Sequence, residues 1–153
     1  MKYRYLLIDN DNTLMDFHAA EHAALREALT EAGIEPTDAV CARYSVINDA
    51  LWKALERGET THAALKIARF AQLLAEYPAE NVCAPRLALR YSHYLGTHAD
   101  LMPGAEAFLR RLHGQMKIVL VSNGDSVIQR NRLFRWITLS SAAKKASASP
   151  IRA

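Results

Sequence analysis

Two carboxylates spaced by one residue, Asp9 and Asp11, stand at the end of a short apolar run, and Thr13 follows two residues later. Two carboxylates this close do not easily stay charged together without a cation or a proton between them. The pattern therefore favours a Mg²⁺ site with one nucleophile and one general acid and base. The open alternative is that these residues form only a turn and a helix cap.

A second polar cluster, Ser122-Asn123-Gly124, follows the apolar run 117–121. A hydroxyl group beside a turn with available backbone N–H groups can hold a phosphate oxygen. An ordinary turn between a strand and a helix is the alternative for this cluster.

The two apolar runs, 5–8 and 117–121, are predicted to be buried strands of a parallel sheet. Each run ends in polar residues, and open α/β sheets bind their ligands at the carboxyl ends of their strands. Between them, 105–112 is predicted to be an amphipathic helix, and 125–134 a helix that follows the second strand. These elements favour an α/β core.

The segment between the motifs contains four helix-like stretches joined by short turns, which is typical of a small helical bundle. Their apolar residues recur at three- and four-residue steps, and glycines, threonines and prolines stand at the breaks. The predicted stretches are 16–33, 36–58, 60–77 and 81–95. An insertion at this point of the chain would form a cap that selects substrates and excludes water.

The composition disfavours two kinds of partner. The formal net charge is +3, but four of the 19 basic residues and none of the 16 acidic ones lie beyond residue 133, which leaves 15 against 16 in residues 1–133. No basic stripe for nucleic acid is therefore expected on the folded part. No apolar run approaches the roughly 18 residues of a membrane span, and no signal peptide is recognised, so a cytoplasmic protein is expected.

The first motif, Asp9-x-Asp11-x-Thr13, and the second, Ser122-Asn123-Gly124, resemble the first two motifs of the haloacid dehalogenase-like hydrolases. Around Asn48, Trp52 and Arg69, and from 129 to 133, the chain is similar to the branch of pyrimidine 5′-nucleotidases. The resemblance covers about residues 1–133. It implies a Rossmann-like core at 1–15 and 100–133, in which two parallel strands are recognisable, with a four-helix cap bundle inserted at 16–99.

The resemblance also implies the role of each residue. Asp9 would attack phosphorus to form an aspartyl-phosphate, and Asp11 would protonate the leaving group and then activate water. Mg²⁺ would bind the Asp9 carboxylate and the backbone carbonyl of Asp11. The residues assigned to phosphate binding are Thr13, Ser122, Asn123 and Gly124. Contact with the substrate stays open for Asn48, Trp52 and Arg69. The alternative is that Trp52 lies in the core of the bundle and that Arg69 lies in solvent.

The expected function is Mg²⁺-dependent hydrolysis of nucleoside 5′-monophosphates or similar small phosphate esters. Members that act as dehalogenases lack the second aspartate, because halide leaves without a proton. The presence of Asp11 therefore favours phosphate ester hydrolysis or phosphomutation.

The family pattern stops after Leu133. A member of the family continues with a third strand, a lysine and a fourth strand that ends in two acids, but no acid follows Asp125 here, and only Lys144 or Lys145 could replace the lysine. Our hypothesis is that 134–153 is an aberrant, out-of-frame or disordered tail on a truncated core. The alternative function is then a non-catalytic member that acts as an interaction module.

Overall fold

The computed structural model describes residues 3–147, and the side chains of residues 3–138. The chain divides into two compact units. Unit 1 comprises Met1–Ala20 and Gly96–Ala153, and unit 2 comprises Glu21–Leu95. The predicted core and cap had their boundaries at 15/16 and 99/100, five residues or fewer from these. No helix within the described residues is long and apolar enough to cross a membrane.

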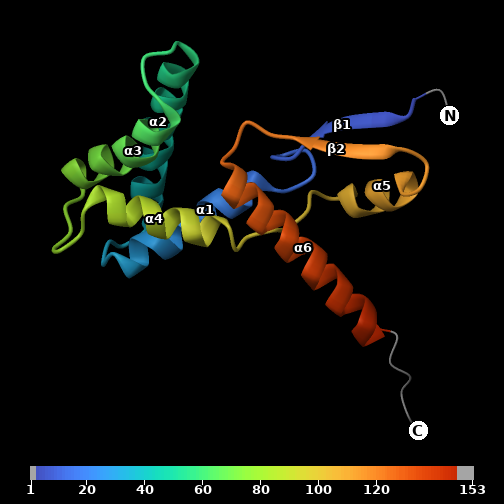
Figure 1. The fold of residues 1–153 in the computed structure, drawn as a ribbon. Coiled ribbons are helices and arrows are strands. Elements are labelled where there is room, and N and C mark those ends of the chain that lie inside the picture. The colour runs from blue at the N-terminus through green and yellow to red at the C-terminus, as the bar shows by residue number, and fades with distance from the viewer. Residues whose placement is uncertain (1–2, 148–153) are drawn as a thin grey trace, which may run out of the picture. The chain divides into compact units, whose positions relative to one another are not determined.

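Unit 1 contains a parallel sheet of two strands, β1 (Tyr5–Asp9) and β2 (Lys117–Val121) (Figure 1). The register runs from Tyr5 opposite Lys117 to Asp9 opposite Val121. Both predicted strands are therefore confirmed, and they end at the same edge of the sheet. The polar residues that follow the two strands therefore begin at neighbouring positions.

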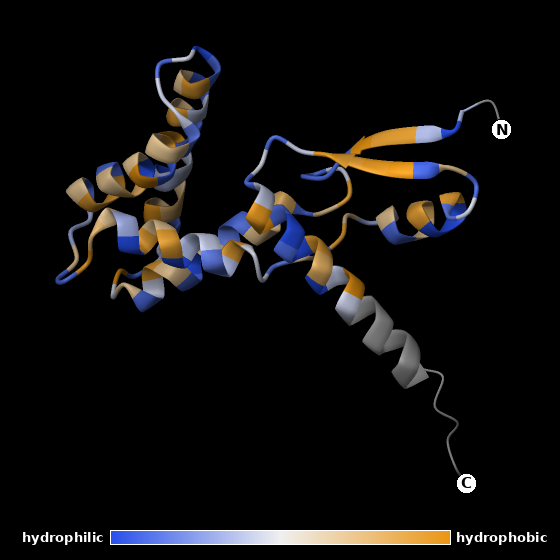
Figure 2. Cartoon of the chain, viewed as in Figure 1, coloured by the Kyte–Doolittle hydropathy of each residue, from blue (hydrophilic) through white to orange (hydrophobic). Residues whose placement is uncertain are grey.

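The prediction that both strands are buried is wrong for the described residues. In β1 the side chains of Leu7 and Tyr5 are 68% and 56% exposed, and Val121 of β2 is 46% exposed. Figure 2 shows both strands as strongly apolar along most of their length. Within residues 3–147 the sheet has only these two strands, so few neighbours cover their apolar side chains.

Two further helices lie in unit 1, α5 (Ala105–Leu112) and α6 (Ser126–Ser147). Asp125 caps α6, because its Oδ1 accepts hydrogen bonds from the backbone N–H groups of Val127 at 2.9 Å and Ile128 at 3.1 Å. The helix was predicted to end at residue 134, but it continues to Ser147. Alanine and lysine favour a helix, and no glycine or proline interrupts 134–147.

A disordered tail from residue 134 is therefore not what the structure contains up to Ser147. The side chains of Lys144 and Lys145, and the whole of residues 148–153, lie outside the described residues. The out-of-frame origin of this segment stays a prediction, which the two other reading frames of the coding DNA past Arg132 would test.

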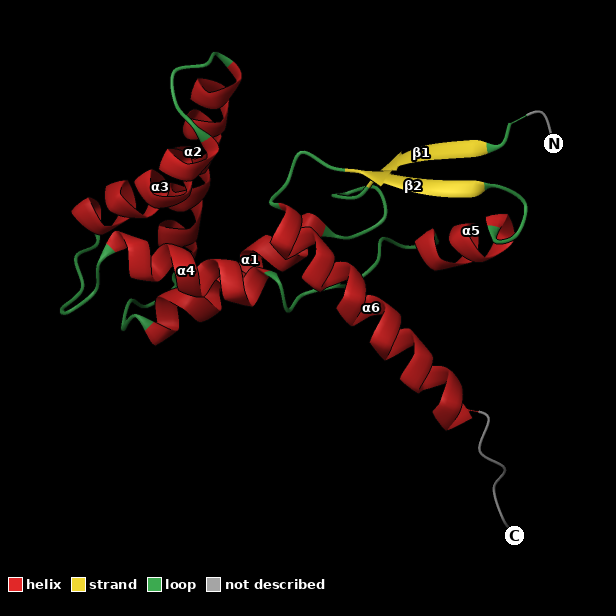
Figure 3. Cartoon of the chain, viewed as in Figure 1, coloured by secondary structure: helices red, strands yellow, loops and turns green. Residues whose placement is uncertain are grey.

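Unit 2 is built from α1 (Phe17–Glu31, of which Glu21 onward belongs to this unit), α2 (Asp38–Glu56), α3 (His62–Glu76) and α4 (Ala84–Leu95) (Figure 3). The hydroxyls of Thr37 and Thr61 accept from the third residue after each, as N-caps should. Helix α3 packs against both α2 and α4. All four predicted helices are confirmed.

The core of unit 2 is an aromatic cluster of Tyr44, Phe70 and Tyr91, whose ring centroids lie 5.3–5.8 Å apart. Arg69 is only 7% exposed, and its guanidinium lies 4.6 Å from the centre of the Tyr91 ring. Arg69 Nη1 also donates to Asn48 Oδ1 at 3.2 Å. The solvated alternative for Arg69 is therefore wrong, and this side chain is part of the core.

The buried tyrosines make unit 2 sensitive to alkali. Burial raises the pKa of Tyr44 and Tyr91 above the ordinary value of about 10. Both rings contribute stability that is complete below that value and is lost as pH rises toward their folded-state pKa. We expect the urea midpoint of unit 2 to fall between about pH 9 and pH 11, and to fall less in Tyr91→Phe. An equal fall in both chains would contradict this assignment.

Candidate active site

The first motif forms a tight loop directly after β1. The backbone N–H groups of Leu14 and Met15 both donate to the carbonyl of Asn10, at 3.0 and 2.9 Å. Asn12 lies in the left-handed region with φ 58°, which asparagine tolerates better than most residues. Its Oδ1 accepts from the backbone N–H of Phe17 at 3.0 Å, at the start of α1. The loop is thus fixed by its own backbone and by the helix that follows.

The chain that returns to unit 1 supports this loop from its other side. The backbone N–H of Met102 donates to the carbonyl of Leu14, and that of Asp16 donates to the carbonyl of Asp100, both at 2.9 Å. Leu14 and Met15 are buried under these contacts. Buried backbone and apolar side chains therefore hold the polar residues of the loop in place.

Asp9 is the last residue of β1, and its side chain is exposed. Thr13 Oγ1 donates to Asp9 Oδ2 at 3.2 Å. In this structure the Thr13 hydroxyl binds the predicted nucleophile, and its role in phosphate binding stays a prediction. That hydrogen bond orients the Asp9 carboxylate.

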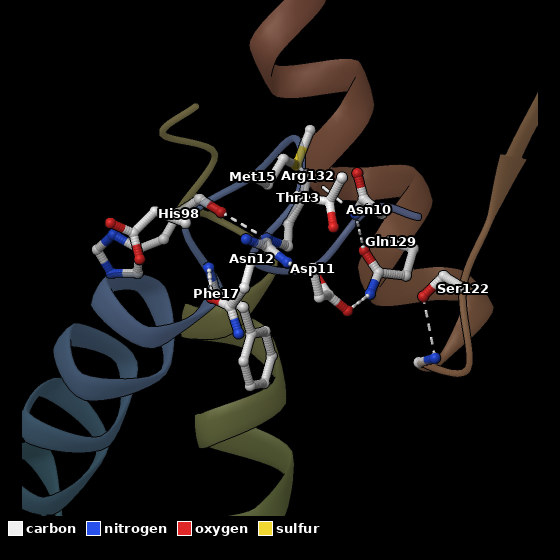
Figure 4. A network of polar contacts seen from close by, with 12 residues as sticks. Asn10, Asp11, Asn12, Thr13, Met15, Phe17, His98, Ser122, Gln129 and Arg132 are labelled. Atoms are coloured by element: carbon white, nitrogen blue, oxygen red, sulfur yellow. Dashed lines mark hydrogen bonds and ion pairs between the residues drawn. The ribbon is translucent and has the colours of Figure 1, made fainter. Parts of the chain in front are cut away.

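Asp11 is half-buried, and α6 engages both of its carboxylate oxygens (Figure 4). Arg132 Nη1 donates to Oδ1 at 2.6 Å, and Gln129 Nε2 donates to Oδ2 at 2.5 Å. The two predicted carboxylates therefore have different surroundings. Asp9 faces solvent beside a hydroxyl, whereas Asp11 is held in a charged hydrogen-bond network.

The second motif forms the turn between β2 and α6. Ser122 follows the last residue of β2, and its Oγ accepts from the backbone N–H of Gly124 at 3.0 Å. A Cβ atom on Gly124 would lie 2.5 Å from Gln129 Nε2, so any larger residue would displace that side chain. Asn123 is exposed between them.

Gln129 joins the two loops. Its Oε1 accepts from Asn10 Nδ2 at 2.5 Å, its Nε2 donates to Asp11, and it stands against Gly124. The structure thereby brings the first and second motifs to one end of the sheet, as the parallel register requires.

Three residues of this network, Asn10, Gln129 and Arg132, have no role predicted from the sequence. Asn10 is 3% exposed and Arg132 is 0% exposed, the largest fully buried side chain of the described residues. Gln129 and Arg132 are three residues apart, which puts both on one face of α6. That spacing, in the helix that follows the second motif, indicates a shared face, but it shows neither the burial of Arg132 nor the contact of both residues with Asp11.

The oxygen donors at this edge suit Mg²⁺. This hard cation prefers carboxylate and carbonyl oxygens and keeps several waters, so two protein ligands and a substrate phosphate are an ordinary set. The exposed Asp9 carboxylate fits such a site. The Asp11 carboxylate fits less well, because Arg132 and Gln129 already occupy its oxygens, so the backbone carbonyl is the better donor. The described residues contain no cluster of three or more His, Cys, Asp or Glu.

Comparison with known proteins accounts for this arrangement. The chain is 38% identical over 132 residues to YfnB of Bacillus subtilis, which is named as a HAD-hydrolase. That match covers 86% of this chain and 56% of YfnB. The chain is a relative of the HAD-hydrolases. It is also 36% identical over 134 residues to the pyrimidine 5′-nucleotidase PynA of Streptococcus pneumoniae, covering 87% of this chain and 56% of PynA.

Solved structures show the same relationship. The magnesium-bound crystal structure of YfnB superimposes with a TM-score of 0.79 at 36% identity, over 88% of this chain and 60% of that one. The defluorinating L-2-haloacid dehalogenase Rha0230 shares the fold alone, with a TM-score of 0.65 at 17% identity over 86% of this chain and 56% of that one. No family model matches the chain. The predicted α/β fold with an inserted helical cap is confirmed, and the chain spans little more than half the length of these relatives.

Proposed function

We propose that this chain is a Mg²⁺-dependent phosphohydrolase of nucleoside 5′-monophosphates or similar small phosphate esters. The observation that carries the proposal is the parallel register, in which Asp9 pairs with Val121. It puts the two carboxylates beside the Ser122–Gly124 turn. The names of PynA and of YjjG of Escherichia coli, both pyrimidine 5′-nucleotidases, support the choice of substrate.

In the first step an Asp9 oxygen attacks phosphorus. The bond from Asp9 to phosphorus forms while the bond from phosphorus to the ester oxygen breaks, and Asp11 gives a proton to the leaving alkoxide. In the second step Asp11 takes a proton from a water molecule, and the oxygen of that water attacks phosphorus. The bond to Asp9 then breaks, and inorganic phosphate leaves.

The remaining residues position charge, which is most of what phosphoryl transfer requires. The Ser122 hydroxyl and the backbone N–H groups of Asn123 and Gly124 would hold phosphoryl oxygens. The Asp9 carboxylate and the Asp11 carbonyl would hold Mg²⁺, which neutralises charge on the phosphoryl oxygens when it is bound. We also propose that unit 2 is the cap whose residues choose the substrate.

The test is hydrolysis of uridine 5′-monophosphate by the purified 153-residue chain, with Mg²⁺ and with EDTA. We expect EDTA to abolish turnover, because the charge on the phosphoryl oxygens is then not neutralised. Added Mg²⁺ should restore turnover, because it neutralises that charge again. Soluble, helical chain that turns over none of the common nucleoside monophosphates with Mg²⁺ present would contradict the proposed function.

One observation favours a second candidate, a non-catalytic interaction module. Two apolar side chains of β1, those of Tyr5 and Leu7, are exposed, and Leu7 is the more exposed of the two. An exposed apolar strand is a surface on which another chain can pair. Mg²⁺-dependent turnover by the isolated chain separates the two candidates, since the interaction module has none.

A further inference from the structure

The Asp11 carboxylate is fixed from two sides by side chains of α6. Arg132 Nη1 binds one of its oxygens and Gln129 Nε2 binds the other, at 2.6 and 2.5 Å. A carboxylate held by two donors keeps one orientation, whereas one on an unsupported loop rotates about its side-chain torsions.

Each of the two donors is itself held. Arg132 Nε donates to the carbonyl of His98 at 2.9 Å, and its guanidinium lies 5.7 Å from the centre of the Phe17 ring. Gln129 Oε1 accepts from Asn10 Nδ2 at 2.5 Å, which fixes the amide so that its nitrogen faces Asp11. The orientation of Asp11 therefore depends both on its two donors and on the residues that hold those donors.

Burying the charged side chain of Arg132 costs free energy, which a contact that only stabilised the fold would not easily recover. Its side chain is completely buried, and its Nη2 has no hydrogen-bond partner among the described residues. Buried ion pairs are often no more stable than apolar residues of similar volume. Gly124 adds a second restriction, because any Cβ there would push Gln129 off Asp11.

We infer that Arg132 and Gln129 are positioning residues that hold the Asp11 carboxylate in the orientation needed for its proton transfers. This inference rests on the proposed function, in which Asp11 is the general acid and base. Gly124, beyond any role in binding phosphate, provides the space that Gln129 occupies. Misplacing a catalytic group by about 1 Å costs on the order of 10²-fold in rate, so this support is needed for turnover.

The test compares two leaving groups in a single turnover with Mg²⁺ present. Uridine leaves as an alkoxide that needs a proton, whereas p-nitrophenolate leaves without one. Arg132→Met and Gln129→Leu are expected to slow uridine release about 10²-fold while p-nitrophenolate release changes less than about threefold. Arg130→Met, an exposed arginine of the same helix, is the matched control and should match the parent chain on both substrates.

Gly124→Ala keeps Gln129 and Arg132 but displaces the Gln129 amide. The closest clash involves the end of a flexible side chain, so the fold should survive, but the new Cβ also lies 3.2 Å from Ser122 Oγ. Some loss on both substrates is therefore expected, with a clearly larger loss in uridine release than in p-nitrophenolate release. Equal losses on both substrates in these variants would overturn the inference and assign Arg132 and Gln129 to the fold alone. Failure of the proposed function looks different, since the parent chain would then release neither leaving group.

A measurement without turnover decides the inference in that case. In chain labelled with ¹⁵N-arginine, the Nε–H signal of Arg132 is identified by its loss in Arg132→Met. Asp11→Asn should shift this signal and speed its exchange with water, because the neutral amide holds the guanidinium more weakly than the carboxylate does, while Arg130→Met should leave it unchanged. An Arg132 signal that Asp11→Asn does not move would overturn the inference whether or not the chain is active.

Discussion

Replacing Asp9 by asparagine is expected to abolish hydrolysis of phosphate esters, with a loss on the order of 10⁴-fold or more in kcat. Asparagine has nearly the same shape, but it is a poor nucleophile and lacks the negative charge that would hold Mg²⁺. The Thr13 hydroxyl can still bind the amide oxygen, so the loop should keep its fold. The loss should therefore appear in kcat with no change in thermal midpoint.

Asp49→Asn is the control for the change in charge, because Asp49 is exposed on α2 and far along the chain from both motifs. It should keep kcat within about twofold of the parent chain, as surface substitutions usually do. Should Asp9→Asn retain a rate within about tenfold of the parent chain, Asp9 would not be the nucleophile.

Replacing Phe70 by alanine is expected to lower the free energy of unfolding of unit 2 by about 3–5 kcal/mol. The Phe70 ring is fully buried, 5.5 Å from the Tyr44 ring and 5.3 Å from the Tyr91 ring. Removing it leaves a cavity between these two aromatic rings and exposes the guanidinium of Arg69 to a gap. Domains typically have a free energy of unfolding of about 5–15 kcal/mol, so this change would remove a large part of it.

The two tryptophans allow this loss to be located. Trp52 lies in α2 of unit 2 and Trp136 in α6 of unit 1, and the chain has no other. In a Trp136→Phe background, urea unfolding followed by fluorescence reports on Trp52 alone. The control is Ile67→Ala, in the same helix as Phe70, whose side chain is 43% exposed. It should lower the free energy of unfolding by less than about 1 kcal/mol. Equal losses in the two variants would contradict the aromatic core described for unit 2.

The elements that could be predicted are those that depend on local pattern. Helical spacing and the glycines, threonines and prolines at the breaks predicted the four helices of unit 2, and two of those threonines, Thr37 and Thr61, are N-caps in the structure. The apolar runs predicted both strands, and their parallel pairing brings the two polar motifs to the same end of the sheet. These signals are set by nearest neighbours in the chain.

What could not be predicted depends on tertiary contacts. A buried arginine looks like a solvated one in a sequence, so neither Arg132 against Asp11 nor Arg69 among the aromatic rings was found. The length of α6 was missed for another reason. The family pattern ends after Leu133, but the residues beyond it are good helix formers, and α6 continues to Ser147.

The most direct test of the central claim is to trap the covalent intermediate in Asp11→Asn. With p-nitrophenyl phosphate and Mg²⁺, Asp9 can still attack, because this leaving group needs no proton. The second step should stall without a base to activate water. After acid quenching, mass spectrometry should find one phosphoryl group on the peptide that contains Asp9. A parent chain that turns over this substrate, with no phosphoryl group on that peptide in Asp11→Asn, would contradict the claim.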